Sequence, residues 1–398
     1  MSARILNTFL ALALISSGQS VLAQTTPEPA AEAKPFACFD AIPPVTELNI
    51  PSRYKDDSKN RSDFDAEANA AVEAALNPVD DFINVLVKNA NAALQITAAP
   101  EGDPETSVDP AAEAASETPD LAKQTAIADC VVDRIHEWAA ANALGDMKSQ
   151  GAQLSVPSRI GGIAMAYAQV RGLATQDARQ SEIEAWLTAR MQASMLFFDT
   201  EAPPKSRQNN LRAWAALAAA QVGLLQNDVV MTTWAADSVK LVLCTATPEG
   251  ALPNEMWRGK LALHYQIHAV GPLVTTTALL QPTFPDLLAT CDNALLRVVR
   301  FTLKAVEDPK LVEVITEKPQ KFDPATEMKR AFQFAWLAPL ETLAQEPDFT
   351  SFAAKFELLS NSKLGGKQSL LWSAPDAKDS AATEEDPAAT EQDPAATP

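Results

Sequence analysis

The chain has 398 residues and a formal net charge of -19, with hydrophobic residues making up 47% of the total. This charge repels other polyanions and anionic membrane surfaces, which argues against non-specific binding to nucleic acid or to such a membrane. With only 13 glycines and with prolines gathered into breaks, the composition favours an all-α body that forms one large domain or two ordinary ones.

The first residues have the pattern of an export signal. Arg4 precedes an apolar run over residues 5–15, and Val21-Leu22-Ala23 forms a small-residue cleavage site. We therefore predict a signal peptide over residues 1–23 and a linker rich in Pro and Ala over residues 24–35. The signal is too short to span a bilayer and no later segment is apolar enough, so we expect a soluble periplasmic protein without membrane insertion.

Four cysteines occur in the chain, and in an oxidising compartment they can pair. The sequence leaves all three connectivities open. We favour Cys38 with Cys130 and Cys244 with Cys291, because each pair would tie the start of a segment to a helix. Buried free thiols are the alternative.

The folded part is expected over residues 36–373. A polar and basic loop at 48–65 precedes a helix over 66–98, which Asn77-Pro78 should break or cap. Residues 99–120 are acidic and almost without large apolar side chains, which predicts a disordered insertion. The tail at 374–398 has a similar composition and is also expected to be disordered.

From Leu121 onward, apolar residues recur at helical spacing between short breaks. Breaks of a few residues imply antiparallel neighbours, so we predict helical hairpins in series. A bundle, a solenoid and a closed ring of hairpins all fit this pattern, although the absence of a fixed period disfavours the solenoid. The predicted helices cover residues 121–145, 159–173, 181–198, 208–225, 231–243, 250–273, 284–306 and 326–343.

The stretch 250–273 carries a candidate pair of chemically active side chains. As one helix it would place Arg258 and Tyr265, seven residues apart, about 20° apart around the axis and roughly 10 Å apart along it. A guanidinium can hold a carboxylate and a phenol can move a proton, so the pair fits chemistry on an acidic sugar. Alternatively, Arg258 is a solvated surface charge and Tyr265 a core aromatic.

A second informative stretch begins at Asn209 and Asn210, which suit the N-cap of a helix. Asn210 is followed 48 residues later by Arg258 and 55 residues later by Tyr265, with LPNE before the arginine and Ala-Leu-x-Tyr around the tyrosine. In this order the motifs resemble those of the alginate lyases, a family of mannuronate-specific polysaccharide lyases.

The resemblance extends over about residues 36–372. It includes PSRYKDDSKNR in the early loop, ADCVVDRIHEWAAANAL, FAWLAPL at 334–340 and LGG at 364–366. The fold that it implies is an incomplete α/α toroid of antiparallel helical hairpins with an open cleft. It also implies an acidic polysaccharide as the partner, and we expect a monomer.

The resemblance assigns roles to individual residues. Asn210 neutralises the sugar carboxylate, Tyr265 carries the proton, and Arg258 orients the sugar acid and favours the ionised phenol through its charge. Basic residues of the three stretches would offset the global negative charge at the cleft. The further residues expected to contact the sugar are Arg53, Lys55, Asn209, Arg212, Trp214 and His268.

Departures from the family pattern bear on activity. Leu211 stands where the family has the histidine of Asn-Asn-His, and its side chain neither accepts nor donates a proton. Gln266 and His268 stand where the family has histidine and tyrosine. His268 follows Tyr265 by three residues on nearly the same helical face, so it could compensate by entering the cleft.

We therefore predict a periplasmic lyase that cleaves mannuronate-rich alginate or a related polyuronate by β-elimination. Leu211 favours a second hypothesis, a catalytically impaired relative that binds acidic polysaccharide, and a secreted helical scaffold without sugar affinity is the third. The sequence has no metal-ligand cluster and no phosphate-binding glycine loop, so we expect no cofactor, no metal and no nucleic-acid partner.

Overall fold

The computed structural model describes residues 36–96 and 110–372. The chain divides into two compact units, Met1–Ala37 and Cys38–Pro398, and the second contains almost all of the described residues. The predicted signal peptide at 1–23, the linker at 24–35 and the tail at 374–398 lie outside the described residues, as do residues 97–109 of the predicted insertion.

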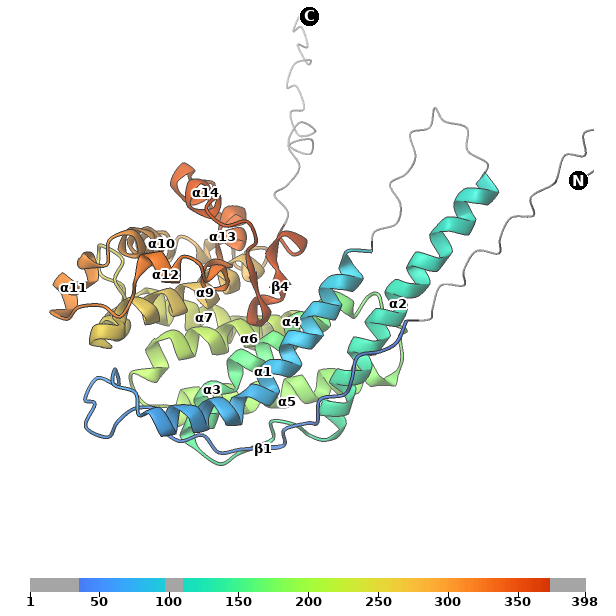
Figure 1. Ribbon diagram of the computed structural model, residues 1–398, viewed down its shortest axis with the longest axis horizontal. Helices are drawn as coiled ribbons and strands as arrows, with labels where there is room; N and C mark the ends of the chain where they lie inside the picture. Colours follow the sequence, from blue (N-terminus) through green and yellow to red (C-terminus); the bar gives the residue numbers. More distant parts are fainter. Residues whose placement is uncertain (1–35, 97–109, 373–398) are drawn as a thin grey trace, which may run out of the picture. The chain divides into compact units, whose positions relative to one another are not determined.

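The described residues are mainly helical, with two short pairs of strands (Figure 1). Strands β1 (Glu47–Leu48) and β2 (Asp146–Met147) are parallel, and β3 (Ser360–Asn361) and β4 (Gly366–Lys367) are antiparallel. The helices are α1 (Ala66–Leu94), α2 (Pro110–Ala140), α3 (Gln150–Ser155), α4 (Pro157–Val170), α5 (Ala178–Thr200), α6 (Asn210–Gln226), α7 (Val229–Leu243), α8 (Pro253–Met256), α9 (Ala262–Leu280), α10 (Thr290–Glu307), α11 (Lys310–Thr316), α12 (Pro324–Glu327), α13 (Leu337–Leu343) and α14 (Pro347–Ala353).

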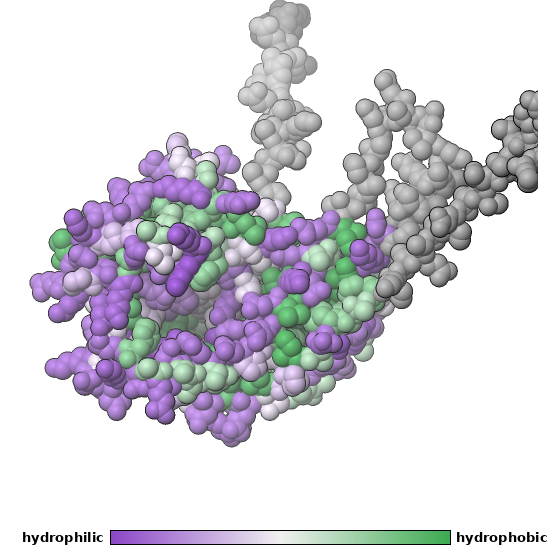
Figure 2. Space-filling view, in the orientation of Figure 1, coloured by the Kyte–Doolittle hydropathy of each residue, from purple (hydrophilic) through white to green (hydrophobic). Residues whose placement is uncertain are grey.

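Helix α6 is the central helix of the second unit. Its sequence is rich in alanine between residues 213 and 220, and all of these residues are buried. A helix that is apolar on every side must be surrounded by protein, and small side chains let neighbours approach closely. Helix α6 accordingly packs against α4, α5, α7 and α9. The result is the incomplete α/α toroid of helical hairpins that was predicted, and Figure 2 shows a hollow in it beneath the C-terminal segments drawn in orange in Figure 1.

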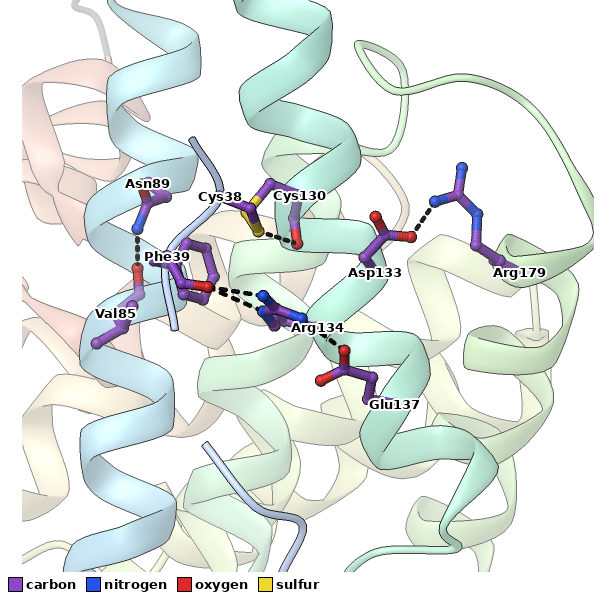
Figure 3. Close-up of a disulfide and its surroundings, with 9 residues drawn as sticks. All are labelled: Cys38, Phe39, Val85, Asn89, Cys130, Asp133, Arg134, Glu137 and Arg179. Carbon is purple, nitrogen blue, oxygen red and sulfur yellow. Dashed lines mark hydrogen bonds and ion pairs between the residues drawn. A yellow bond between two sulfur atoms is a disulfide. The ribbon is translucent and has the colours of Figure 1, made fainter. Parts of the chain in front are cut away.

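Two disulfides join distant parts of the fold, and both pairs are those favoured from the sequence. Cys38 pairs with Cys130 of α2, and Cys244 after α7 pairs with Cys291 at the start of α10. Figure 3 shows that the first disulfide is accompanied by Arg134, whose guanidinium donates two hydrogen bonds to the carbonyl of Phe39, at 3.0 and 2.8 Å. The extended segment after Cys38 is therefore held along α2 by covalent and polar contacts together.

Removal of the second disulfide should lower the free energy of unfolding. Cys244 and Cys291 are 47 residues apart, and closing a loop of this size removes chain entropy from the unfolded state worth about 4 kcal/mol. The Cys244→Ser, Cys291→Ser double variant should therefore unfold at a lower denaturant concentration than the unmodified chain, as measured by circular dichroism. A midpoint equal to that of the unmodified oxidised chain would contradict this expectation.

Several helix boundaries predicted from the sequence are wrong. Pro78 does not break α1: the helix continues through it to Leu94 and lacks one backbone hydrogen bond there. Likewise, α9 continues through Pro272. Helix α2 begins at Pro110, inside the segment predicted to be disordered, where alanines and a proline at the first position favour a helix.

Other differences concern short helices and turns. The helix predicted over 326–343 is divided into α12, a 3₁₀ turn at Ala331–Phe334 and α13. The short helices α3, α11 and α14 were not predicted, because six or seven residues give too few turns for a periodic pattern. In the part of the chain that the structure describes, no helix is both long and apolar enough to cross a membrane.

Candidate active site

Arg258 and Tyr265 lie in direct contact, although they do not share a helix. Arg258 lies in a turn after α8 and Tyr265 lies in the first turn of α9. Gly259 has a φ of +55°, a conformation that favours glycine, and a Cβ there would lie 2.5 Å from the side-chain Nδ2 of Asn60. The turn places the guanidinium carbon 3.6 Å from the centre of the Tyr265 ring. The two side chains are therefore in contact, whereas the single helix that we expected, with roughly 10 Å between the residues along its axis, is wrong.

Tyr54 is the third member of this cluster. Its hydroxyl is hydrogen-bonded to the hydroxyl of Tyr265 and accepts a hydrogen bond of 2.7 Å from Nη2 of Arg258. Arg258 also donates to the carbonyls of Asn60 and Arg61, at 3.2 and 2.6 Å, and so fixes the loop that carries Tyr54. Of the three guanidinium nitrogens of Arg258, Nε and Nη2 donate hydrogen bonds to described residues and Nη1 donates none. Tyr54 was not among the site residues predicted from the sequence, although it follows Arg53 in the motif PSRYKDDSKNR.

The phenol of Tyr265 is protonated at rest. Burial raises its pKa above the ordinary value of 10, and the positive charge of Arg258 lowers the pKa by less. Tyr54, whose hydroxyl contacts that of Tyr265, raises the pKa further. Arg258 therefore favours the ionised phenol, as expected, but burial changes the pKa of Tyr265 by more.

Asn210 is joined to this cluster through Glu255. Its backbone N–H donates to Oε1 of Glu255 at 2.7 Å, and its side-chain Nδ2 donates to Oε2 at 2.9 Å. The carbonyl of Glu255 accepts from the backbone N–H of Arg258 at 2.9 Å. Oδ1 of Asn210 is buried and has no partner among the described residues. Asn209 caps α6, because its Oδ1 accepts from the N–H of Leu211 at 3.0 Å, as expected for an N-cap residue.

Glu255 should make the free energy of unfolding depend on pH. Complete burial raises its pKa from 4.5 to about 7, and the bonds from Asn210 and the charge of Arg258 lower the pKa by less. The folded chain therefore retains a proton that the unfolded chain has lost, so stability should fall by about 3 kcal/mol as the pH rises from 4.5 through 7. Glu255→Gln should remove this fall when urea unfolding is measured at pH 5 and pH 8.

The exposed Glu249 offers a matched control, since Glu249→Gln should leave the pH trend unchanged. Glutamine at position 255 has one side-chain oxygen to accept from the two donors of Asn210, so the substitution also changes the absolute stability. The comparison therefore uses the change in the free energy of unfolding with pH. An identical trend in Glu255→Gln and the unmodified chain would show that Glu255 does not hold the proton.

A cavity of about 310 Å³ lies next to this cluster. His264 and His268, which flank Tyr265 on α9, line the cavity, and their ring centres lie 5.0 and 6.5 Å from that of Tyr265. Trp214 lies across from His268 with 5.3 Å between ring centres, and its buried Nε1 has no partner among the described residues. The indole N–H is therefore available to a hydrogen-bond acceptor in the cavity.

Positive charges are concentrated around this cavity. Arg330 and Lys363 line it. Nζ of Lys363 lies 3.1 Å from Oδ1 of Asp80, and Oδ2 of Asp80 lies 2.6 Å from Nη2 of Arg159. Burial, and then the charge of Arg159, lowers the pKa of Lys363 to about 8. Arg53 lies close enough for its charge to lower the pKa of both histidines and of Lys363. Cations therefore outnumber carboxylates here, in contrast to the charge of the whole chain.

His268 faces the cavity but is a poor proton carrier. Removal from bulk solvent lowers its pKa to about 3, and the nearby positive charges act in the same direction. The imidazole is therefore neutral at physiological pH. Its position supports the predicted contact with a sugar, whereas its pKa does not support a role as general base.

Other predicted residues lie away from the cavity. The guanidinium of Arg212 is buried, donates to Oγ of Ser238 at 2.8 Å and pairs with Asp199 at 2.9 Å, so it is occupied inside the fold. Lys55 is exposed, and its hydrogen bonds to described residues are made by its backbone, which donates to Asp63 and accepts from Ser58. Leu211 packs against an apolar cluster that includes Phe197 and Phe198. A leucine at this position thus has a packing role of its own.

Comparisons with known proteins find relatives both in sequence and in fold. The family model described as alginate lyase matches residues 48–312. The chain is 28% identical to an alginate lyase of Pseudomonas fluorescens over 260 residues, which is 63% of this chain and 68% of the relative. It is also 28% identical to an alginate lyase of Pseudomonas aeruginosa over 252 residues, which is 61% of this chain and 67% of the relative.

Solved structures with a similar fold include alginate lyase A1-III of Sphingomonas species A1. Its TM-score is 0.64 at 20% identity, with 85% of this chain and 86% of that chain covered. A histidine-to-alanine variant of that enzyme complexed with tetrasaccharide has a TM-score of 0.63 at 19% identity and the same coverage. At this identity the structural likeness shows the fold alone, and the assignment to a family rests on the family model.

Proposed function

The chain belongs to the alginate lyase family, and from this premise we propose that it is a periplasmic lyase that cleaves mannuronate-rich alginate by β-elimination. The observation that carries the proposal is the contact of Tyr265 with Arg258 and Tyr54 beside a cavity rich in cations. The tetrasaccharide complex of the related enzyme supports an oligosaccharide as the ligand. The periplasmic location rests on the sequence of residues 1–23.

Tyr265 is the proposed proton carrier. β-Elimination breaks the C–H bond beside the sugar carboxylate, forms a carbon–carbon double bond and breaks the neighbouring carbon–oxygen bond. The oxygen of ionised Tyr265 takes the proton from carbon and returns it to the leaving oxygen, so the phenolate is regenerated. Arg258 over the ring stabilises the phenolate during this cycle, and Tyr54 holds the position of the reacting oxygen through the hydrogen bond between the two hydroxyls.

The sugar carboxylate is proposed to be neutralised from the cavity side. Nη1 of Arg258 donates no hydrogen bond to any described residue, and Nδ2 of Asn210 is bonded to Glu255, so neither residue offers a complete clamp. Lys363, Arg330 and the indole N–H of Trp214 face the same space and supply the remaining donors. In this scheme Asn210 acts as a positioning residue, because its bonds to Glu255 hold the turn that carries Arg258.

A protein that binds alginate without cleaving it is the second candidate function, and Leu211 favours it because no imidazole follows Asn210. Mixing the purified protein with alginate separates the candidates. Appearance of ultraviolet absorbance from an unsaturated uronate supports the lyase, and binding without this absorbance supports the non-catalytic relative. Absence of both would leave a helical scaffold and would refute the proposal.

A further inference from the structure

A second cavity adjoins the one beside Tyr265. Its volume is about 660 Å³, which falls in the range of ordinary ligand sites. The two cavities share the lining residues Asn84, Phe332, Asn361 and Ser362. The hollow next to the catalytic cluster therefore continues toward the C-terminal end of α1, and the second part is called the outer cavity below.

The outer cavity lies between one face of α1 and the C-terminal hairpin. One wall is formed by polar residues that recur at helical spacing, namely Asn84, Lys88 and Asn91 of α1 and its C-cap residue Gln95. Strands β3 and β4 form the opposite wall, which includes Lys367, and Phe332 lies at the border with the inner cavity. Phe332 and the hairpin lie beyond residues 48–312, which the family model matches.

The walls of the outer cavity are fixed to each other. Nδ2 of Asn91 donates to the carbonyl of Gly365 at 2.9 Å, and its Oδ1 accepts from the N–H of Lys367 at 2.8 Å. Gly366 has a φ of +95°, and a Cβ there would lie 2.3 Å from Oδ1 of Asn91, so the hairpin sits directly on α1. The outer cavity is thus a preformed feature of the fold.

The groups that face the outer cavity suit an anionic, hydroxyl-rich ligand. Lys88 and Lys367 make no ion pair with any described residue, and the side-chain amides of Asn84 and Gln95 have no hydrogen-bond partner among those residues. None of the described residues that line the outer cavity is acidic, in a chain with a net charge of -19. The ring of Phe332 is 53% exposed, which offers an apolar face at the border.

We propose that the outer cavity is a distal subsite, which holds uronate units of the same acidic polysaccharide that do not reach Tyr265. Lys88 and Lys367 pair with carboxylates of these units, and Phe332 packs against the face of a sugar ring between the two cavities. The polymer is identified by the proposed function, on which this inference rests.

The test compares oligomannuronates of increasing length. The Lys88→Ala, Lys367→Ala double variant should lower the ratio of kcat/KM on an octamer to kcat/KM on a trimer by about tenfold, because two charge-assisted contacts are lost only on the longer chain. Phe332→Ala should lower the same ratio. Lys304→Ala, which removes an exposed lysine of α10, is the matched control and should leave the ratio unchanged.

Binding measured by calorimetry separates this inference from the proposed function. If the unmodified chain cleaves nothing, the proposed function fails, whereas tighter binding of the octamer that depends on Lys88 and Lys367 would still support the distal subsite. An unchanged ratio and unchanged octamer affinity in the double variant would overturn the inference, as would an equal loss on trimer and octamer. Equal binding of a neutral octasaccharide would also overturn it, because the lysines would then not select charge.

Discussion

Tyr265→Phe is expected to lower kcat/KM on mannuronate-rich alginate by about a thousandfold, because general acid and base catalysis by one group contributes on this scale. The substitution removes a single oxygen, which is hydrogen-bonded to the hydroxyl of Tyr54. The aromatic ring beneath Arg258 remains, at the observed distance of 3.6 Å from the guanidinium carbon to the ring centre. Because the fold and the position of the Arg258 charge are retained, the decrease in kcat/KM measures the contribution of proton transfer.

Tyr167 provides the matched control for this substitution. Its hydroxyl lies between α4 and α5, where it donates to Glu184 at 3.2 Å, away from the residues that line the cavity. Tyr167→Phe should therefore retain its activity. Full activity in Tyr265→Phe would instead show that another group carries the proton, and His264 would be the next residue to replace.

The pH profile gives a second measurement of the same role. Burial raises the pKa of Tyr265 above 10, so the ionised fraction is small at neutral pH and increases about tenfold for each pH unit below that pKa. The rate on saturating alginate should accordingly rise with pH on the alkaline side, up to the pH at which the fold is lost. A rate that is flat across this range would contradict a phenolate as the base.

The helices were predictable from the sequence where apolar periodicity is long, as in α5, α6 and α7. Their breaks were less predictable, because Pro78 and Pro272 read locally as stops. In the structure both prolines lie in helices that neighbouring elements cover, and packing outweighs the missing hydrogen bond. Local propensity therefore located the elements better than it located their ends.

The cluster of Tyr54, Arg258 and Tyr265 was predictable only in part. Arg258 and Tyr265 were singled out by a spacing argument that assumed one helix, and they meet through the turn at Gly259 instead. Tyr54 reaches Tyr265 across 211 residues of sequence, and Lys363 belongs to a hairpin near the end of the chain. No local pattern specifies such contacts, because they depend on how the whole toroid packs.

Arg212 was expected at the cavity but is bonded inside the fold. A cation next to the Asn209-Asn210 motif was expected to face the sugar, yet its guanidinium lies 4.2 Å from the ring centre of Trp234 and bonds Asp199. On a helix buried on all sides, the direction of each side chain follows from its angle around the axis. Trp214 and Arg212 are two positions apart, about 200° around the helix, so only one of them can face the cavity.

The second large effect is expected from Arg258→Met, which should lower kcat/KM on alginate by about a hundredfold or more. The substitution removes the positive charge above the Tyr265 ring and the three hydrogen bonds that hold the loop at Tyr54, Asn60 and Arg61. Arg258→Lys should recover only part of the activity, because an ammonium cannot reproduce the planar fork of donors. Arg300→Met, which breaks the exposed pair with Glu346, is the control for loss of an arginine.

A double-mutant cycle distinguishes the two contributions of Arg258. If the arginine acts by holding Tyr54 against Tyr265, Tyr54→Phe should cost much less activity in the Arg258→Met background than in the unmodified chain. If it acts only through its charge on the phenolate, the two losses should be additive. The geometry favours the first outcome, because Nη2 of Arg258 is shared between the Tyr54 hydroxyl and the Arg61 carbonyl and so connects the loop to the site. Additive losses would show that the loop contact is structural and that the charge alone supports the proton transfer.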